Sequence, residues 1–218
     1  MSVGLELKEI ETLFTDNEGV FKFSRWNRPI VPIVFGVDDE TLVHLKTAIV
    51  TTVGVTGNKI EETDPELGAN FMWFFCQDWD EILSIPDLKK LIPNIRDIVG
   101  KLESSSSKSY RIFAFDSMGG IKMCVQLIKV VEETAEMSIQ ALVTGETFQC
   151  LLLFSRNAFI DESPIAQISK NNLCVPKPKY AALVRAAYDQ VLPVATQEKS
   201  HSLRLHARSN LLIAGINE

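Results

Sequence analysis

The sequence predicts an α+β fold built around a buried helix, and three observations support this class. Apolar side chains recur at helical spacing in some segments and alternate in others, so helices and strands are both expected. Tyr110–Phe115 and Ile121–Val131 have strand character and are joined by a short turn, which predicts a hairpin. Ser138–Ser155 is apolar nearly all round, as is typical of a helix inside a core. Helices and strands mixed in this way favour α+β.

Composition indicates an ordinary globular chain. Its 218 residues can bury a sizeable core, and 46% are apolar and 23% charged. The formal net charge of -6 argues against a nucleic-acid partner, because phosphate binding needs clustered Lys and Arg. We expect a single domain over residues 1–218, with a core at about 21–193 and a C-terminal helical extension at 194–218.

The first helix and strands are predicted from the spacing of apolar residues and from the positions of the prolines. Leu5–Phe14 carries apolar residues at helical spacing and predicts a short helix. Phe21–Trp26 alternates, and Ile30–Phe35 continues as a strand whose prolines place it at a sheet edge or at its own beginning. Asp38–Asp39 can cap a helix that runs to about Val53.

The next segments are shorter. Asn58–Thr63 predicts a short strand, and Ala69–Cys76 predicts a strongly apolar one. Pro86–Val99 predicts a helix with a bend at Pro93. Ser104–Ser107 is the only low-complexity stretch, and its length favours a loop over a domain linker.

The second half begins with the hairpin, whose turn is Asp116–Gly120. The buried helix is expected from about Glu133 to Ser155, followed by a loop over Arg156–Asn172. Tyr180–Val191 predicts another helix. The last segment, Gln197–Ile213, is amphipathic at helical spacing and predicts the C-terminal helix.

Glu146 and Gln149 are the leading candidates for chemistry. They stand three residues apart in the middle of the buried helix, so they share one face. A buried carboxylate is costly without a partner. Two interpretations stay open: a structural ion pair with an arginine such as Arg185, Arg204 or Arg208, or a general base that activates water.

Histidine is scarce, and the three positions give no metal site. A catalytic zinc needs three protein ligands. His201 and His206 are five residues apart, roughly 140° around a helix, so they are poorly placed to share one ion. His44 lies on the polar side of another expected helix. We expect all three to face solvent, and no metal or other cofactor.

The other motifs of catalysis and binding are missing or weak. The four cysteines have no Cys-x-x-Cys spacing, and three lie in apolar runs, so they are expected to be buried thiols rather than zinc ligands or disulfides. Gly-x-Ser-x-Gly and the glycine-rich phosphate loops do not occur in the sequence. Asp78–Glu81 lacks the ligand spacing of a calcium loop and is typical of a solvated helix cap.

Several short motifs occur together in one order along the chain. They are Trp26-Asn27-Arg28-Pro29-Ile30, Gly54 to Gly57, Ala69-Asn70-Phe71, Gly119-Gly120-Ile121, Glu146-x-x-Gln149-x-Leu151 and Ala186-Ala187-Tyr188-Asp189. This set resembles a bacterial family catalogued as domain of unknown function 2927. The similarity covers roughly Phe21 to Pro193. It departs from the family pattern at Gly145, where an acidic residue is usual, and at Cys150, where alanine is usual.

The resemblance implies a zincin-like architecture, a mixed sheet packed against the buried central helix. In a zinc-protease helix of the His-Glu-x-x-His type, Gly145 and Gln149 would stand where the two histidines are, so the metal motif would be degenerate. Such folds place an edge strand before this helix and pair substrate peptide with it. By this resemblance Ile121–Val131 would be the edge strand.

The function expected from these observations is a zincin-like domain without a metal site, acting as a non-catalytic binding or interaction protein for a peptide or protein. The alternative is a peptidase-like hydrolase that uses Glu146 as general base. Nucleic acid is not an expected partner, because the net charge is negative. A membrane is not expected either, because no apolar run reaches the roughly 20 residues of a span. The sequence as written predicts a cytoplasmic protein, and a periplasmic or secreted one if a leader has been removed.

Overall fold

A four-stranded mixed sheet forms the centre of the computed structural model, which describes residues 4–105, 107–131, 139–168 and 173–215. The strand order is β2 (Pro32–Phe35), β3 (Phe71–Cys76), β5 (Ile121–Lys129) and β4 (Ser109–Phe115). β2, β3 and β5 are mutually parallel, and β4 runs antiparallel to β5. The fold is therefore α+β with a mixed sheet, as the sequence predicts.

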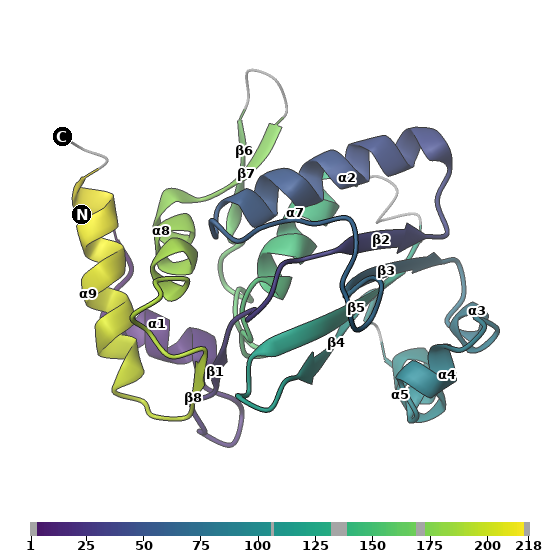
Figure 1. The fold of residues 1–218 in the computed structure, drawn as a ribbon, viewed down its shortest axis with the longest axis horizontal. Coiled ribbons are helices and arrows are strands. Elements are labelled where there is room, and N and C mark those ends of the chain that lie inside the picture. The colour runs from purple at the N-terminus through teal and green to yellow at the C-terminus, as the bar shows by residue number, and fades with distance from the viewer. Residues whose placement is uncertain (1–3, 106, 132–138, 169–172, 216–218) are drawn as a thin grey trace.

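Helices cover both faces of this sheet (Figure 1). The long helix α2 (Asp39–Gly54) packs along α7 (Ile139–Cys150) on one face. The short helices α3 (Asp80–Leu83), α4 (Leu88–Leu91) and α5 (Ile95–Glu103) lie against the other. Successive side chains of β3 point to opposite faces of the sheet, and nearly all of them are apolar. Both faces of the sheet are therefore apolar and are covered by helices.

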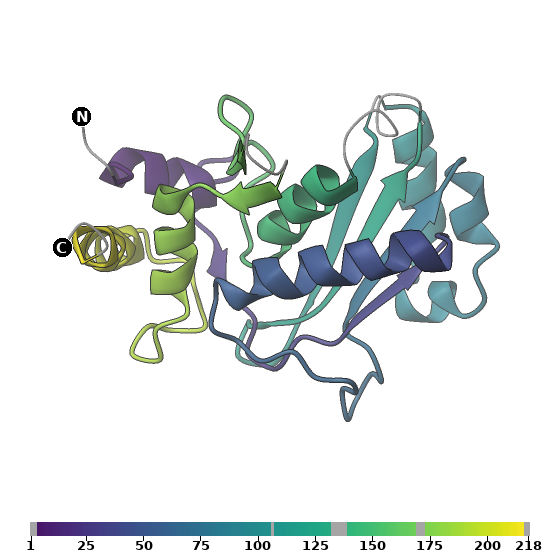
Figure 2. The ribbon, with the colours of Figure 1, turned by 90° about the horizontal axis from the view of Figure 1, so that it is seen from above.

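The N- and C-terminal helices form a group beside the sheet (Figure 2). α9 (His201–Ala214) packs against α8 (Pro178–Ala187) and α1 (Leu7–Phe14). A two-stranded ribbon of β1 (Phe23–Ser24) and β8 (Ala195–Thr196) joins this group to the rest of the chain. A hairpin of β6 (Ile165–Ile168) and β7 (Leu173–Pro176) packs on α7.

Most of the expected elements are confirmed. Asp38 caps α2 by accepting a hydrogen bond from the Thr41 amide, and Asp116–Gly120 is the turn between β4 and β5. Pro32 is the first residue of β2, and β2 lies at an edge of the sheet, as its prolines predict. The C-terminal helix is present as α9.

Three local expectations are wrong. Asn58–Thr63 is not a strand and contributes a single bridge, between Ile60 and Ile30. The helix expected over Pro86–Val99 is split at Pro93 into α4 and α5, because proline cannot donate the next helical hydrogen bond. The loop expected over Arg156–Asn172 contains β6.

The largest correction concerns β5, which was expected to be the edge strand. It pairs with β3 on one side and with β4 on the other, so its backbone groups are taken. Strand addition to Ile121–Lys129 is therefore excluded. The edges of the sheet are β2 and β4.

The buried helix is shorter than expected at its C-terminal end. α7 ends at Cys150, whereas the sequence predicts helix to Ser155. The expected start near Glu133 lies outside the described residues. Among the described residues, no helix combines the length and the apolar character that crossing a membrane requires.

Candidate functional site

Glu146 lies on the face of α7 that packs on the sheet, where three side chains donate hydrogen bonds to its carboxylate. Ser109 Oγ lies 3.0 Å from Oε1, while Arg111 Nη1 and Gln126 Nε2 lie 3.2 and 2.9 Å from Oε2. The Glu146 side chain is 13% exposed, so the carboxylate is largely withdrawn from water. Its charge is balanced by the guanidinium of Arg111.

The arginine that pairs with Glu146 differs from the three that the sequence suggests. Arg185, Arg204 and Arg208 were the expected arginines, but the ion pair is made by Arg111 of β4. Arg208 pairs instead with Asp189. The register of the hairpin explains the choice, because Arg111 lies opposite Gln126 and both point to the α7 face of the sheet.

Gln149 does not share this cluster. It is half-buried, and none of the described contacts joins it to the Glu146 carboxylate. The amide that binds Glu146 is that of Gln126, which is not among the residues that the sequence singles out. A signal was present, because Gln126 is the one polar residue between Met123 and Ile128 in an otherwise apolar strand.

The cysteines are buried free thiols, as expected. Cys150 Sγ donates a hydrogen bond to Gln126 Oε1 at 3.4 Å, which connects the thiol to the Glu146 cluster. Burial raises the pKa of the Cys150 thiol well above its ordinary value, so the thiol is protonated at neutral pH. A protonated buried thiol is a poor nucleophile.

The histidines differ from one another. His44 is exposed, and His206 is half-buried beside Asn210. His201 was expected to face solvent, but it is only 1% exposed and packs on Phe23 with the ring centroids 4.4 Å apart. Within the described ranges, no three residues of the types His, Cys, Asp and Glu are grouped so as to hold a metal ion.

Most of the short motifs quoted above meet in space around the segment Trp26–Val31. The Trp26 indole donates a hydrogen bond to the Cys150 carbonyl at the end of α7, and Asn27 binds the Asp116 carboxylate of the hairpin turn. Gly120 lies against Asn27 so closely that a Cβ would lie 2.7 Å from the Asn27 Cβ. The motif glycine is thus explained by the side chains of Asn27 and Val194, which leave no room for a Cβ at this position.

Asn70 fastens this segment to β3. It is fully buried; its Oδ1 accepts a hydrogen bond from the Val31 amide at 2.8 Å, and its Nδ2 donates to the Pro29 carbonyl and to Asp64 Oδ2, both at 2.9 Å. Every polar atom of its side chain is therefore bonded.

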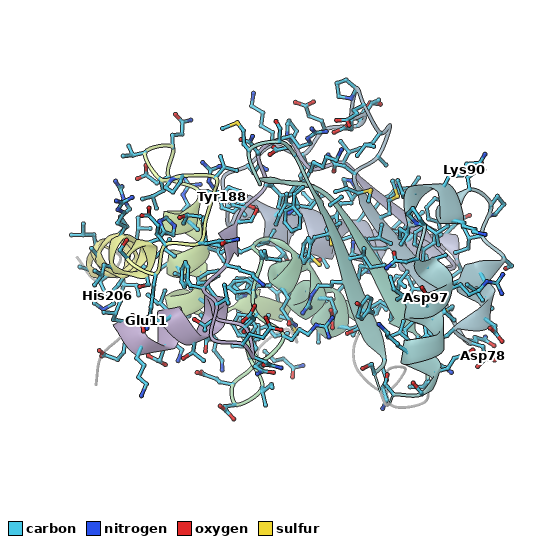
Figure 3. All side chains as sticks on the ribbon, turned by 90° about the horizontal axis from the view of Figure 1, so that it is seen from below. Glu11, Asp78, Lys90, Asp97, Tyr188 and His206 are labelled. Atoms are coloured by element: carbon cyan, nitrogen blue, oxygen red, sulfur yellow. The ribbon has the colours of Figure 1, made fainter. Side chains whose placement is uncertain are left out.

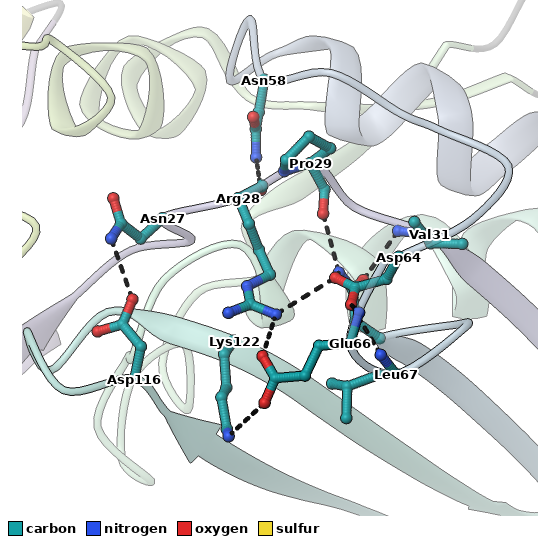
Figure 4. A network of polar contacts seen from close by, with 11 residues as sticks. Asn27, Arg28, Pro29, Val31, Asn58, Asp64, Glu66, Leu67, Asp116 and Lys122 are labelled. Carbon is teal, nitrogen blue, oxygen red and sulfur yellow. Dashed lines mark hydrogen bonds and ion pairs between the residues drawn. The ribbon is translucent and has the colours of Figure 1, made fainter.

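Arg28 extends this network to the turn at residues 64–68 (Figure 4). Its Nη1 lies 3.3 Å from Asp64 Oδ2 and 3.0 Å from Glu66 Oε2, and Lys122 Nζ binds the other oxygen of Glu66. Burial alone would raise the pKa of Asp64. The amides of Leu67 and Glu66, the amide of Asn70 and the charge of Arg28 hold this pKa below its ordinary value. The turn is thereby fixed in place.

This fixed turn closes one end of an apolar groove of about 880 Å³ between the β2 edge of the sheet and the segment that includes α4. Its walls carry apolar side chains that remain partly or largely exposed: Ile33, Phe35, Leu67, Met72, Ile85 and Leu91. Phe35 is 44% exposed, and its ring stacks on Phe74 with the centroids 4.9 Å apart. Lys90 of α4 lines this groove. It lies at the end of the molecule away from Tyr188 and His206 (Figure 3).

The outer backbone edge of β2 is open beside this groove. The Val31 carbonyl accepts the Phe71 amide, so residues 31, 33 and 35 direct their backbone groups to β3. Pro32 and Val34 therefore direct theirs outward. The segment at Lys59–Glu61 occupies this outer side at Ile30 only, where it makes two backbone hydrogen bonds. Beyond Ile30, no hydrogen bond between described residues reaches the outward groups of Pro32 and Val34.

Comparison with known proteins adds no relative: no family model, no curated protein and no solved structure matches this chain.

Proposed function

We propose that this protein is a non-catalytic peptide-binding domain that takes an extended segment of a partner along β2. The observation that carries the proposal is the apolar groove beside an open strand edge. An added strand would accept the Val34 amide and donate to the carbonyls of Pro32 and Val34. Alternate side chains of that strand would lie against the exposed rings and aliphatic chains of the groove.

The Glu146 cluster supports binding over hydrolysis. A general base needs a lone pair that the water it activates can reach, and the Glu146 side chain is only 13% exposed. Both oxygens of Glu146 accept hydrogen bonds from the protein, one of them from Arg111 and Gln126 together. Such an arrangement is typical of a buried structural ion pair. The hydrolase alternative is therefore the weaker of the two.

A zincin-like relationship is part of this proposal. Its support is the resemblance in sequence together with one feature of the fold, a helix with a central glutamate packed on a mixed sheet. The peptide, however, is proposed to bind at β2, since β5 is a central strand.

Selection from a library of random heptapeptides displayed on phage tests the proposal. We expect enrichment of sequences with apolar residues at alternate positions, and binding of the synthetic peptides with Kd of about 1–100 μM. Val34→Pro removes the outward amide at an edge position where proline is tolerated, and it should weaken binding at least about tenfold. If no selected peptide prefers the wild-type protein to this variant, the proposal is wrong.

A second variant guards against a folding defect in Val34→Pro. Leu91→Glu places a charge on the α4 wall of the groove and should also abolish binding. Val43→Glu is its matched control, because Val43 is 64% exposed on α2 and does not line the groove. All variants should melt within a few degrees of the wild type. A wild-type dimer that Val34→Pro makes monomeric would show that the edge pairs with a second copy, which would overturn the proposal.

A further inference from the structure

The groove and the open edge of β2 are surrounded by acidic side chains. At the end near Ile30, Glu61 and Glu62 are exposed, and Glu62 lines the groove. At the other end, three consecutive exposed acids begin α2: Asp38, Asp39 and Glu40. Both ends of the edge strand therefore carry negative charge.

Few cations balance these acids. Among the described residues, Lys90 is the only basic side chain that lines the groove, and its Nζ lies 2.7 Å from Asp87 Oδ1. Lys59 is exposed beside Glu61 and offsets one charge. Asp38 stays ionised, because the amide and hydroxyl of Thr41 hold its pKa below the ordinary value. The five acids at the two ends of β2 thus outnumber the two basic side chains named beside them, Lys59 and Lys90.

From this charge pattern we infer that the partner segment is a basic peptide, with apolar residues at alternate positions and Lys or Arg at both ends. The inference rests on the proposed function, because it concerns the occupant of the same groove. A heptapeptide spans roughly 23 Å when extended. Residues that flank a central apolar stretch would therefore lie near the two acidic ends of the four-residue strand β2. Opposite charges at the rim of an interface favour association and select the partner.

Charged variants of one selected peptide test this inference. Two synthetic versions share the apolar positions and differ only at the ends, one with Lys and one with Glu. We expect the Lys version to bind wild-type protein at least about tenfold more tightly at 50 mM NaCl. The difference should shrink severalfold at 500 mM NaCl, because salt screens exposed charges.

Neutralising the acids supplies the protein side of the test. Glu61→Gln with Glu62→Gln should weaken the Lys version about threefold to tenfold and leave the Glu version unweakened. The matched control is Glu18→Gln with Glu198→Gln, which removes the same charge from two exposed sites that do not line the groove. Loss of affinity in both double variants would indicate net charge alone and would overturn the inference.

The outcomes separate the two proposals. If peptides are selected and depend on Val34 but the Lys and Glu versions bind equally, the peptide-binding function stands and the basic partner is wrong. If no peptide binds at β2, the proposed function itself fails.

Discussion

Arg111 and Glu146 form an ion pair of 3.2 Å that joins the edge strand β4 to the helix α7 across the α7 face of the sheet. The Arg111 side chain is 22% exposed and the Glu146 side chain 13% exposed, so water screens the pair only in part. Ser109 and Gln126 also donate hydrogen bonds to the carboxylate. This arrangement predicts that the charge of Glu146 stabilises the fold.

Glu146→Gln keeps the shape of the side chain and removes its charge. It should lower the free energy of unfolding by about 1–3 kcal/mol, because Arg111 is left without its counter-ion. For a chain of this size that is a fall in Tm of about 3–10 °C. Thermal melting measures it, and Glu103→Gln on the exposed face of α5 is the control.

A double-mutant cycle with Arg111→Gln assigns the effect to the pair. We expect a coupling energy above about 0.5 kcal/mol, as for residues in direct contact. An unchanged Tm in Glu146→Gln, together with lost binding or activity, would contradict the structural role and make Glu146 a functional residue.

Asn70→Asp tests the network that fixes the 64–68 turn. The substitution keeps the shape but removes both donor bonds, to the Pro29 carbonyl and to Asp64. It also places a second carboxylate beside that of Asp64, and two buried like charges repel. We expect a loss of about 2–4 kcal/mol in unfolding free energy.

Chemical denaturation followed by tryptophan fluorescence measures this loss, because Trp26 and Trp73 are fully buried. Asn94→Asp is the matched control, since Asn94 is exposed at the start of α5, and its side chain makes no capping hydrogen bond. Equal stability of the two variants would show that the Asn70 network is dispensable.

Zinc content tests the expectation that the chain lacks a metal site. Gly145 supplies no ligand and Gln149 only an amide, a poor ligand for zinc. Elemental analysis of protein purified without chelators should find far less than one zinc per chain. About one zinc per chain would contradict the expectation.

Introducing the two histidines of the His-Glu-x-x-His motif makes that test sharper. In Gly145→His with Gln149→His, the new rings would share one face of α7. Space is present at Gly145, where a Cβ would lie 3.6 Å from Ile165 Cδ1, an ordinary contact. Zinc bound by this double variant and not by the wild type would support the zincin-like resemblance.

Much of the fold could be predicted from local pattern. Proline placed β2 at an edge, and an aspartate marked the start of α2. Pairing between distant strands could not be predicted in this way. The position of β5 between β3 and β4 cannot be predicted from the sequence. An apolar strand has the same residue pattern in the centre of a sheet as at its edge.

The candidate site was predicted only in part, for the same reason. A central glutamate in an apolar helix indicated a partnered charge, and a partnered charge is present. The identity of Arg111 depends on how α7 packs on the β4–β5 hairpin, which is a long-range property. The groove depends on which apolar side chains the tertiary packing leaves exposed, and Ile33 and Phe35 look like any other strand residues in the sequence.

His201 gives the last prediction, a loss of stability in mild acid. The ring is buried against Phe23, and neither nitrogen has a hydrogen-bond partner in the described part of the chain. Burial, helped by the charge of Arg204, lowers the pKa of His201 to about 4. The folded state therefore favours the neutral ring, and the unfolded state binds a proton at about pH 6.5. Stability from this group is complete above about pH 6.5 and falls as the pH drops toward 4, by at most about 3 kcal/mol.

His201→Phe isolates this effect, because phenylalanine keeps the aromatic contact with Phe23 and cannot be protonated. Melting curves from pH 7.5 to pH 4.5 should show a smaller fall in Tm for the variant than for the wild type. Carboxylates also titrate in this range, but they do so in both proteins, so the difference between the two curves reports His201 alone. Parallel curves would mean that the ring is protonated in the folded protein as readily as in the unfolded chain.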